Sequence, residues 1–235
     1  FYYAEKDQKP EQGPSENLYD YFKVYDSVPS LGNQTYSVYL KGNTSGLDVK
    51  VKVGFDAGVN SGIRSVEYAN SGDKQDVVIR TCGAITAVTV NAPKDEVHHF
   101  GNAYVVNVTA VAKNSYYENG AVGALNVKEG KVEVQRDAFV GTVAVDKDAT
   151  SETVIINNNG TVFNTEVIEY DAENMDHKEA GEQTAGASAI INAVSTASAD
   201  DVLRIGNGDA LVNLAVAHSN GDTSKAIKIE LTADI

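Results

Sequence analysis

Residues 86–90 read Thr-Ala-Val-Thr-Val, and three similar runs follow: Val105-Val106-Asn107-Val108, Ala124-Leu125-Asn126-Val127 and Thr142-Val143-Ala144-Val145. Their central apolar residues are Val88, Val106, Leu125 and Val143, so the steps are 18, 19 and 18 residues. A weaker fifth copy is centred on Val162, 19 residues further on. A strand that recurs at one period indicates a β-solenoid, in which each coil stacks on its neighbours.

A turn position precedes each apolar centre by five residues, and it holds Gly83, Gly101, Gly120, Ala138 and Asn157 in order. Glycine and asparagine tolerate positive φ, so they suit a sharp corner. We therefore expect an all-β protein built as a single elongated parallel β-helix, or β-solenoid. It would have about 18–19 residues per coil and less regular capping ends.

Each coil also contains a second strand-like run, which is expected to stack on its equivalent in the next coil. The segment Val97-His98-His99-Phe100-Gly101 aligns with Tyr116-Tyr117-Glu118-Asn119-Gly120 at a step of 19 residues. This alignment predicts that His98 stacks on Tyr117 in the next coil. Asn107 and Asn126 share a register in the main strand, which predicts a small amide ladder.

The chain divides into four segments by composition. Residues 1–30, rich in aromatic residues and proline, are an N-terminal cap or linker, and residues 31–165 are the β-solenoid. Residues 166–186 are an acidic loop excursion, and residues 187–235 are an irregular β continuation or C-terminal cap. Within this last segment we expect strands at 202–205, 211–216 and 226–231, whereas 187–191 fits a helix or a strand.

Charge and composition exclude several classes of partner. The formal net charge is −14, which argues against nucleic acid because phosphate binding needs clustered Lys and Arg. No stretch approaches the roughly 18 apolar residues of a membrane span, so we expect no membrane insertion. Cys82 is the single cysteine, and we interpret it as a small, partly buried residue without redox function.

The repeats resemble a known group of proteins. The corner-and-strand pattern, Val88-Thr89-Val90-Asn91-Ala92-Pro93 leading to His98-His99-Phe100-Gly101, and the stretch from Thr109 to Gly120 are similar to parallel β-helix surface proteins of gut-associated Gram-positive bacteria. The resemblance covers roughly residues 60–165. It implies export and an adhesive or structural role, and it carries over no catalytic residue.

We expect no catalytic residues and no cofactor. Adjacent His98 and His99 point to opposite faces of a strand, so they cannot both ligate one metal ion. Asp146 and Asp148 alternate onto one side, but one coil earlier the equivalent positions are Lys128 and Gly130, which gives no second acid. Calcium is the one metal hypothesis; its candidate ligands are Asp171, Glu173 and Asp176, and the sequence favours a solvated acidic loop there.

The preferred function is therefore non-enzymatic: an extracellular surface, adhesive or matrix protein built as a rigid rod, with glycans or other surface proteins as partners. One alternative is a carbohydrate-active β-helix enzyme or a sugar-binding module. Another is a self-assembling filament subunit that uses its N-terminal segment to pair with a neighbour's open edge. An acid-and-aromatic groove on one face would favour the first alternative, and a uniform Thr/Asn/Lys face would favour a spacer.

Overall fold

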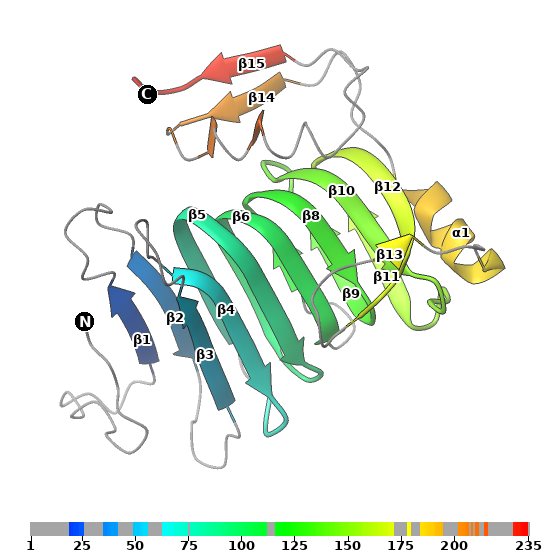
Figure 1. Cartoon of the computed structure of the whole chain (residues 1–235), viewed down its shortest axis with the longest axis horizontal. Coiled ribbons are helices and arrows are strands. Elements are labelled where there is room, and N and C mark those ends of the chain that lie inside the picture. The colour runs from blue at the N-terminus through cyan, green and yellow to red at the C-terminus, as the bar shows by residue number, and fades with distance from the viewer. Residues whose placement is uncertain are drawn as a thin grey trace.

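The computed structural model describes residues 19–25, 35–41, 49–55, 63–74, 76–111, 116–171, 178–179, 184–194, 202–206, 208, 210–211, 214–215 and 228–234. The expected fold class is confirmed: a parallel sheet winds into a β-solenoid of about five turns (Figure 1). Its elements are β1 (Tyr19–Tyr25), β2 (Thr35–Lys41), β3 (Val49–Phe55), β4 (Ile63–Asn70), β5 (Asp76–Ala92), β6 (Glu96–Val111), β7 (Tyr116–Glu118), β8 (Ala121–Val127), β9 (Gly130–Val134), β10 (Phe139–Asp146), β11 (Val154–Asn158), β12 (Thr161–Glu169), β13 (Lys178–Glu179), α1 (Ala185–Ala193), β14 (Val202–Ile205) and β15 (Lys228–Leu231).

The solenoid has two strand ladders joined at a corner. The first ladder runs β4–β5–β6–β8–β10–β12, and all of its neighbours are parallel. The second ladder runs from the first half of β6 through β7 and β9 to β11, again in parallel. Strands β5 and β6 are long because each turns the corner and contributes to both ladders.

The core lies between the two ladders and is filled mainly by valine. Val66, Val88, Val106, Leu125 and Val143 form one column, in which each residue is paired with the next and at most 2% exposed. Burying a side chain of this size contributes about 1.5–3 kcal/mol, so a single coil could not offset the cost of ordering its backbone. The column is continuous across the coils, which makes their folding interdependent.

The two ends of the solenoid are built differently (Figure 1). At the C-terminal end α1 covers the core with Ile190, and its C-cap residue Val194 joins the same cluster. Thr184 caps the helix by accepting a hydrogen bond from the Ala187 N–H at 3.3 Å. At the N-terminal end the chain reverses: β2 pairs antiparallel with β5, and β3 pairs antiparallel with β4. β1 then pairs antiparallel with β2. Residues 1–18 and 26–30 of the expected cap lie outside the described residues.

The C-terminal segment packs on the outer surface of the first ladder. Leu203 and Ile205 of β14 contact a cluster that includes Phe139 and Phe163, whose rings meet edge to face at 4.7 Å. β14 and β15 fall within the strands predicted at 202–205 and 226–231, and the structure pairs them in parallel. No helix among the described residues is long and apolar enough to cross a bilayer.

Three details of the sequence prediction were wrong. Val162 is not the fifth equivalent of Val143, because Val143 pairs with Thr165 and Val162 pairs with Val140. Asn157 lies inside β11, so it does not form a corner. The run 211–216 is not a strand, since its described residues Leu211, Leu214 and Ala215 are helical. The segment 187–191, left open between helix and strand, is part of α1.

Candidate functional site

Among the described residues, two carboxylates of the solenoid are completely buried, at 0% exposed. The first is Asp95, which is 0% exposed and follows the turn after β5. The Tyr68 hydroxyl donates to its Oδ2 at 2.6 Å, and Asn70 Nδ2 lies 2.9 and 3.0 Å from its two oxygens. Because β4 stacks directly on β5, Tyr68 and Asn70 are brought to the end of the strand that Asp95 follows. The carboxylate fastens the first parallel pair of strands together.

The second buried carboxylate is Glu118, and its partner is His99. Both side chains are fully buried, and His99 Nδ1 lies 2.9 and 3.0 Å from the two carboxylate oxygens. The Tyr116 hydroxyl donates to Oε2 at 2.8 Å, and the Gly120 N–H donates to Oε1 at 2.7 Å. This arrangement satisfies the carboxylate from three sides inside the core. A carboxylate enclosed in this way stabilises the fold and is not accessible to a substrate.

Burial raises the pKa of both tyrosine hydroxyls that bind these acids. For Tyr116 the main cause is loss of solvent, followed by the negative charge and the hydrogen bond of Glu118. For Tyr68 it is again loss of solvent, followed by the hydrogen bond and charge of Asp95. Each phenol is therefore held protonated in the folded protein at a pH where an exposed tyrosine would lose its proton.

We expect the protein to lose stability steeply above pH 10. In the unfolded chain a tyrosine titrates near its ordinary pKa of 10.0, whereas folded Tyr68 and Tyr116 keep their protons at higher pH. The folded state then binds more protons, so stability from these groups is complete below pH 10 and falls as pH rises, by about 1.4 kcal/mol per pH unit for each tyrosine. Urea unfolding at a series of alkaline pH values measures this slope, and Tyr116→Phe should reduce it. Full phenolate absorption from all 12 tyrosines while the protein stays folded would contradict it.

The candidate residues from the sequence fall in different places. His98 and His99 do point to opposite faces: His98 stacks on Tyr117, with ring centroids 4.5 Å apart and planes 8° from parallel, as predicted. The amide ladder is also confirmed, since Asn126 Nδ2 donates to Asn107 Oδ1 at 2.9 Å.

Asp146 and Asp148 have different surroundings. Asp146 is buried and accepts hydrogen bonds from the N–H groups of Asp148 and Tyr170, whereas Asp148 is exposed beside Lys147. Of the calcium candidates, Asp171 is described, and Glu173 and Asp176 lie outside the described residues. Within the described part of the chain, no three His, Cys, Asp or Glu side chains gather as metal ligands. The side chain of Cys82 likewise lies outside what the structure describes.

A chemically varied surface lies on the outer side of the second ladder, near the corner. We call it the corner patch, and it comprises two rows of side chains. His98, Tyr117 and Glu133 are register partners on β6, β7 and β9. Two residues further along the chain lie Phe100 on β6, Asn119 just after β7 and Gln135 just after β9, and all three line one hollow. All six are partly exposed.

Internal hydrogen bonds order the polar half of the corner patch. Gln135 Nε2 donates to Glu133 Oε1 at 2.9 Å, and Asn159 Nδ2 approaches the same oxygen at 3.3 Å. Asn119 Nδ2 donates to the Tyr117 carbonyl at 3.1 Å. The pKa of the Tyr117 hydroxyl is raised by partial burial and by the charges of Glu96 and Glu133. The patch is thus an ordered set of rings, amides and carboxylates on a rigid sheet.

The connection from β9 to β10 is longer than its equivalents, and a hollow lies between it and the corner patch. β7 joins β8 through residues 119–120 and β11 joins β12 through residues 159–160, but β9 joins β10 through residues 135–138, which we call the corner loop. The two additional residues make this loop project. It forms, together with Phe100 and Asn119, a hollow of about 230 Å³ with exposed Arg136 and Asp137 at its rim. The structure shows no ion pair for Arg136 or Asp137 within the described residues.

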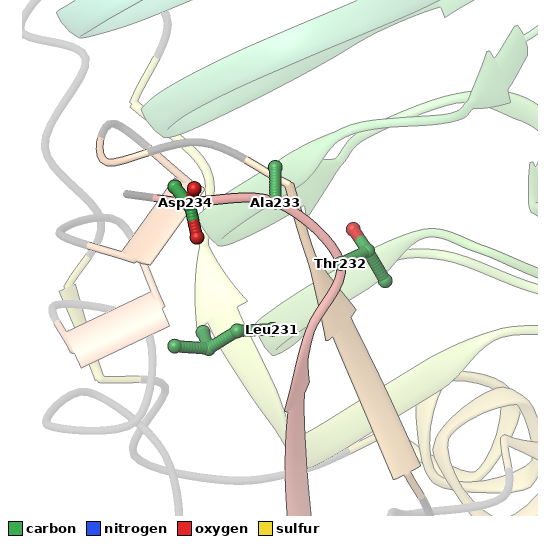
Figure 2. Close-up of a pocket in the computed structure, with 4 residues that line it drawn as sticks. All are labelled: Leu231, Thr232, Ala233 and Asp234. Carbon is green, nitrogen blue, oxygen red and sulfur yellow. The ribbon is translucent and has the colours of Figure 1, made fainter.

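A second hollow, of about 620 Å³, lies beside the C-terminal segment and is lined by Leu231, Thr232, Ala233 and Asp234 (Figure 2). Its lining comes from four consecutive residues, and the Thr232 hydroxyl already donates to the Ile205 carbonyl at 3.2 Å. Figure 2 shows the four side chains strung along one stretch of chain rather than converging from several elements. The corner patch is therefore the stronger candidate site.

Sequence reasoning missed the buried acids and the hollow. The alignment of residues 97–101 with 116–120 does place His99 opposite Glu118, and that register is what the structure contains. The signal was therefore present for the His99–Glu118 pair. No comparable repeat signal marks the corner loop, because its two additional residues have no equivalent in the neighbouring coils.

Comparison with known proteins adds no relative: no family model matches the chain, and we found no similar curated protein or solved structure. The structure defines a parallel β-solenoid and says nothing about a particular bacterial surface family.

Proposed function

We propose that this chain is a non-enzymatic extracellular surface protein of adhesive or matrix type, in which a rigid β-solenoid displays a binding face. The observation that supports this most is the use of its internal acids. Asp95 and Glu118 are fully enclosed and saturated with hydrogen bonds that join neighbouring coils. Carboxylates that could serve acid–base chemistry are instead employed to hold a rod together.

The geometry of the outer surface supports a role in presenting a binding face to a ligand. Side chains on the second ladder are held in rows by continuous parallel pairing, so a ligand would meet a fixed array rather than mobile loops. The formal charge of −14 keeps such a surface solvated. Adhesion to a glycan or to another surface protein needs a fixed array of this kind and no turnover.

Two measurements test the proposal. Antibodies raised against the purified chain should stain intact cells that produce it, and staining that requires permeabilisation would contradict an extracellular location. The purified chain should also release no new reducing ends from a panel of plant, fungal and bacterial polysaccharides. Release that disappears in Glu133→Gln or Asp137→Asn would overturn the non-enzymatic role in favour of a carbohydrate-active enzyme.

A further inference from the structure

The aromatic half of the corner patch offers a platform for an apolar ligand face. His98 and Tyr117 stack in parallel, and Phe100 continues the surface toward the hollow. The His98 side chain is 32% exposed and is steadied by Glu96, whose Oε1 lies 3.1 Å from Nε2. The stack covers one face of Tyr117, so a pyranose ring would pack its C–H face against the opposite face of this fixed ring, with little loss of side-chain entropy.

The polar half is rich in hydrogen-bond acceptors. The side-chain amide nitrogens of Asn119 and Gln135 already donate within the protein. Their side-chain amide oxygens are therefore the atoms that can accept a hydrogen bond from a ligand. Glu133 uses Oε1 to hold Gln135, and its second oxygen is a further acceptor. A ligand that suits this edge must bring several donors, as a set of hydroxyl groups does.

The charges around the hollow disfavour an anionic ligand. Glu133 and Asp137 repel an anion, and the exposed guanidinium of Arg136 offsets part of their attraction for a cation. Arg136 also supplies forked N–H donors at the rim of the hollow. A neutral molecule with both donors and acceptors meets no unfavourable charge here.

The dimensions fit a chain rather than a single small molecule. The hollow of about 230 Å³ is open to the surface and continues onto the rows of β6, β7 and β9. Neighbouring strands are about 4.8 Å apart, so these three strands span about 10 Å. A terminal sugar ring in the hollow would leave the following rings on the aromatic platform.

We propose that the corner patch, together with the corner loop, binds a neutral oligosaccharide. Tyr117 is the stacking platform, the oxygens of Asn119 and Gln135 accept from sugar hydroxyls, and Arg136 donates from the rim. This rests on the proposed adhesive function and names the class of its ligand.

The test is affinity measurement with the full chain. Cellohexaose, maltohexaose and mannohexaose serve as neutral probes, with oligogalacturonate and chitosan oligomers as anionic and cationic probes, in titration calorimetry. We expect at least one neutral probe to bind more tightly than both charged ones. Tyr117→Ala and Arg136→Ala should each weaken that binding by about tenfold. Binding of none of the neutral probes, or tighter binding of a charged probe, would overturn the proposal.

Matched variants separate a binding role from a structural one. Tyr104→Ala removes a partly exposed tyrosine from the part of β6 that lies beyond the corner. Lys128→Ala removes an exposed cation that lies over the ring of Tyr170. We expect both to bind as the unaltered chain does, with unchanged circular dichroism. Equal weakening by these controls would contradict the site. Release of shorter sugars from the bound probe would contradict the non-enzymatic function while leaving the site in place, and failure to bind would leave the surface role standing without this ligand.

Discussion

Replacing Glu118 by alanine is expected to lower the free energy of unfolding by about 3–5 kcal/mol. The change removes the acceptor for the buried His99 ring and Tyr116 hydroxyl and for the partly buried Gly120 N–H. Water has no access to replace it, because the His99 and Glu118 side chains are fully buried. Each orphaned polar group then carries its desolvation cost in addition to the cavity left behind. Urea unfolding followed by circular dichroism measures the loss.

Two variants bracket the Glu118 result. Glu118→Gln keeps the shape and one acceptor oxygen, so it should lose less stability than the alanine variant. Glu96→Ala removes a carboxylate from the outer face of the same ladder, where the Glu96 side chain is 34% exposed and contacts His98 and Lys74, and it should cost less than about 1 kcal/mol. Equal losses for Glu118→Ala and Glu96→Ala would show that the internal carboxylate does not hold the coils together.

The second large effect is expected at a corner, in Gly120→Ala. A Cβ at this position would lie 1.9 Å from the carbonyl oxygen of Gly101, in the coil directly before. That oxygen belongs to backbone held in the ladder, where Gly101 itself has φ of 108°, so it has no rotamer through which to move away. We expect a loss of about 4 kcal/mol or more, seen as a large drop in melting temperature or in soluble yield.

The same substitution at Gly206 is the control. There the nearest atom to an added Cβ is the Thr232 hydroxyl oxygen at 3.2 Å, which is the end of a side chain. Gly206→Ala should change stability by less than about 1 kcal/mol. A Gly120→Ala protein as stable as Gly206→Ala would mean that the coils are not packed at this corner as described.

The reason for glycine at the corners differs from the one the sequence suggested. Positive φ was the expected cause, and it holds at Gly101. At Gly120 the cause is instead the close approach of the preceding coil. Both causes select the same amino acid, so the sequence predicted the corner without distinguishing them.

Contacts between stacked positions were predictable where the chain keeps its period. The stacking of His98 on Tyr117 and the bond from Asn126 to Asn107 both follow from an offset of 19 residues. The prediction failed at Val162 because Val143 pairs with Thr165, an offset of 22. The connections between strands vary in length. A count that assumes a fixed period therefore assigns the wrong pairing partner after a longer connection.

The candidate site was predictable only in part. Alternation along β6 and β7 places His98 and Tyr117 on the outer side, as it does for any strand with one buried face. The same alternation puts Glu118 on the inner side with His99, but the general preference of charged residues for the surface argued against burial of Asp95 and Glu118. The reversal of β2 and β3 at the N-terminal end was also missed, since a strand's direction leaves no mark on its apolar pattern.

Unequal coil lengths have a consequence for how this protein can diverge. Along the second ladder Tyr116 pairs with Val132 and Gly130 with Val154, offsets of 16 and 24 residues, yet inward side chains stay aligned throughout. The differences in coil length therefore lie in the connections between strands, where added residues do not change which face of the sheet a strand residue occupies. A residue added within a strand would exchange inside for outside along its whole length. Corners such as residues 135–138 are thus places where whole peptides can be gained, lost or grafted, so that recognition can change by insertion while the core sequence remains the same.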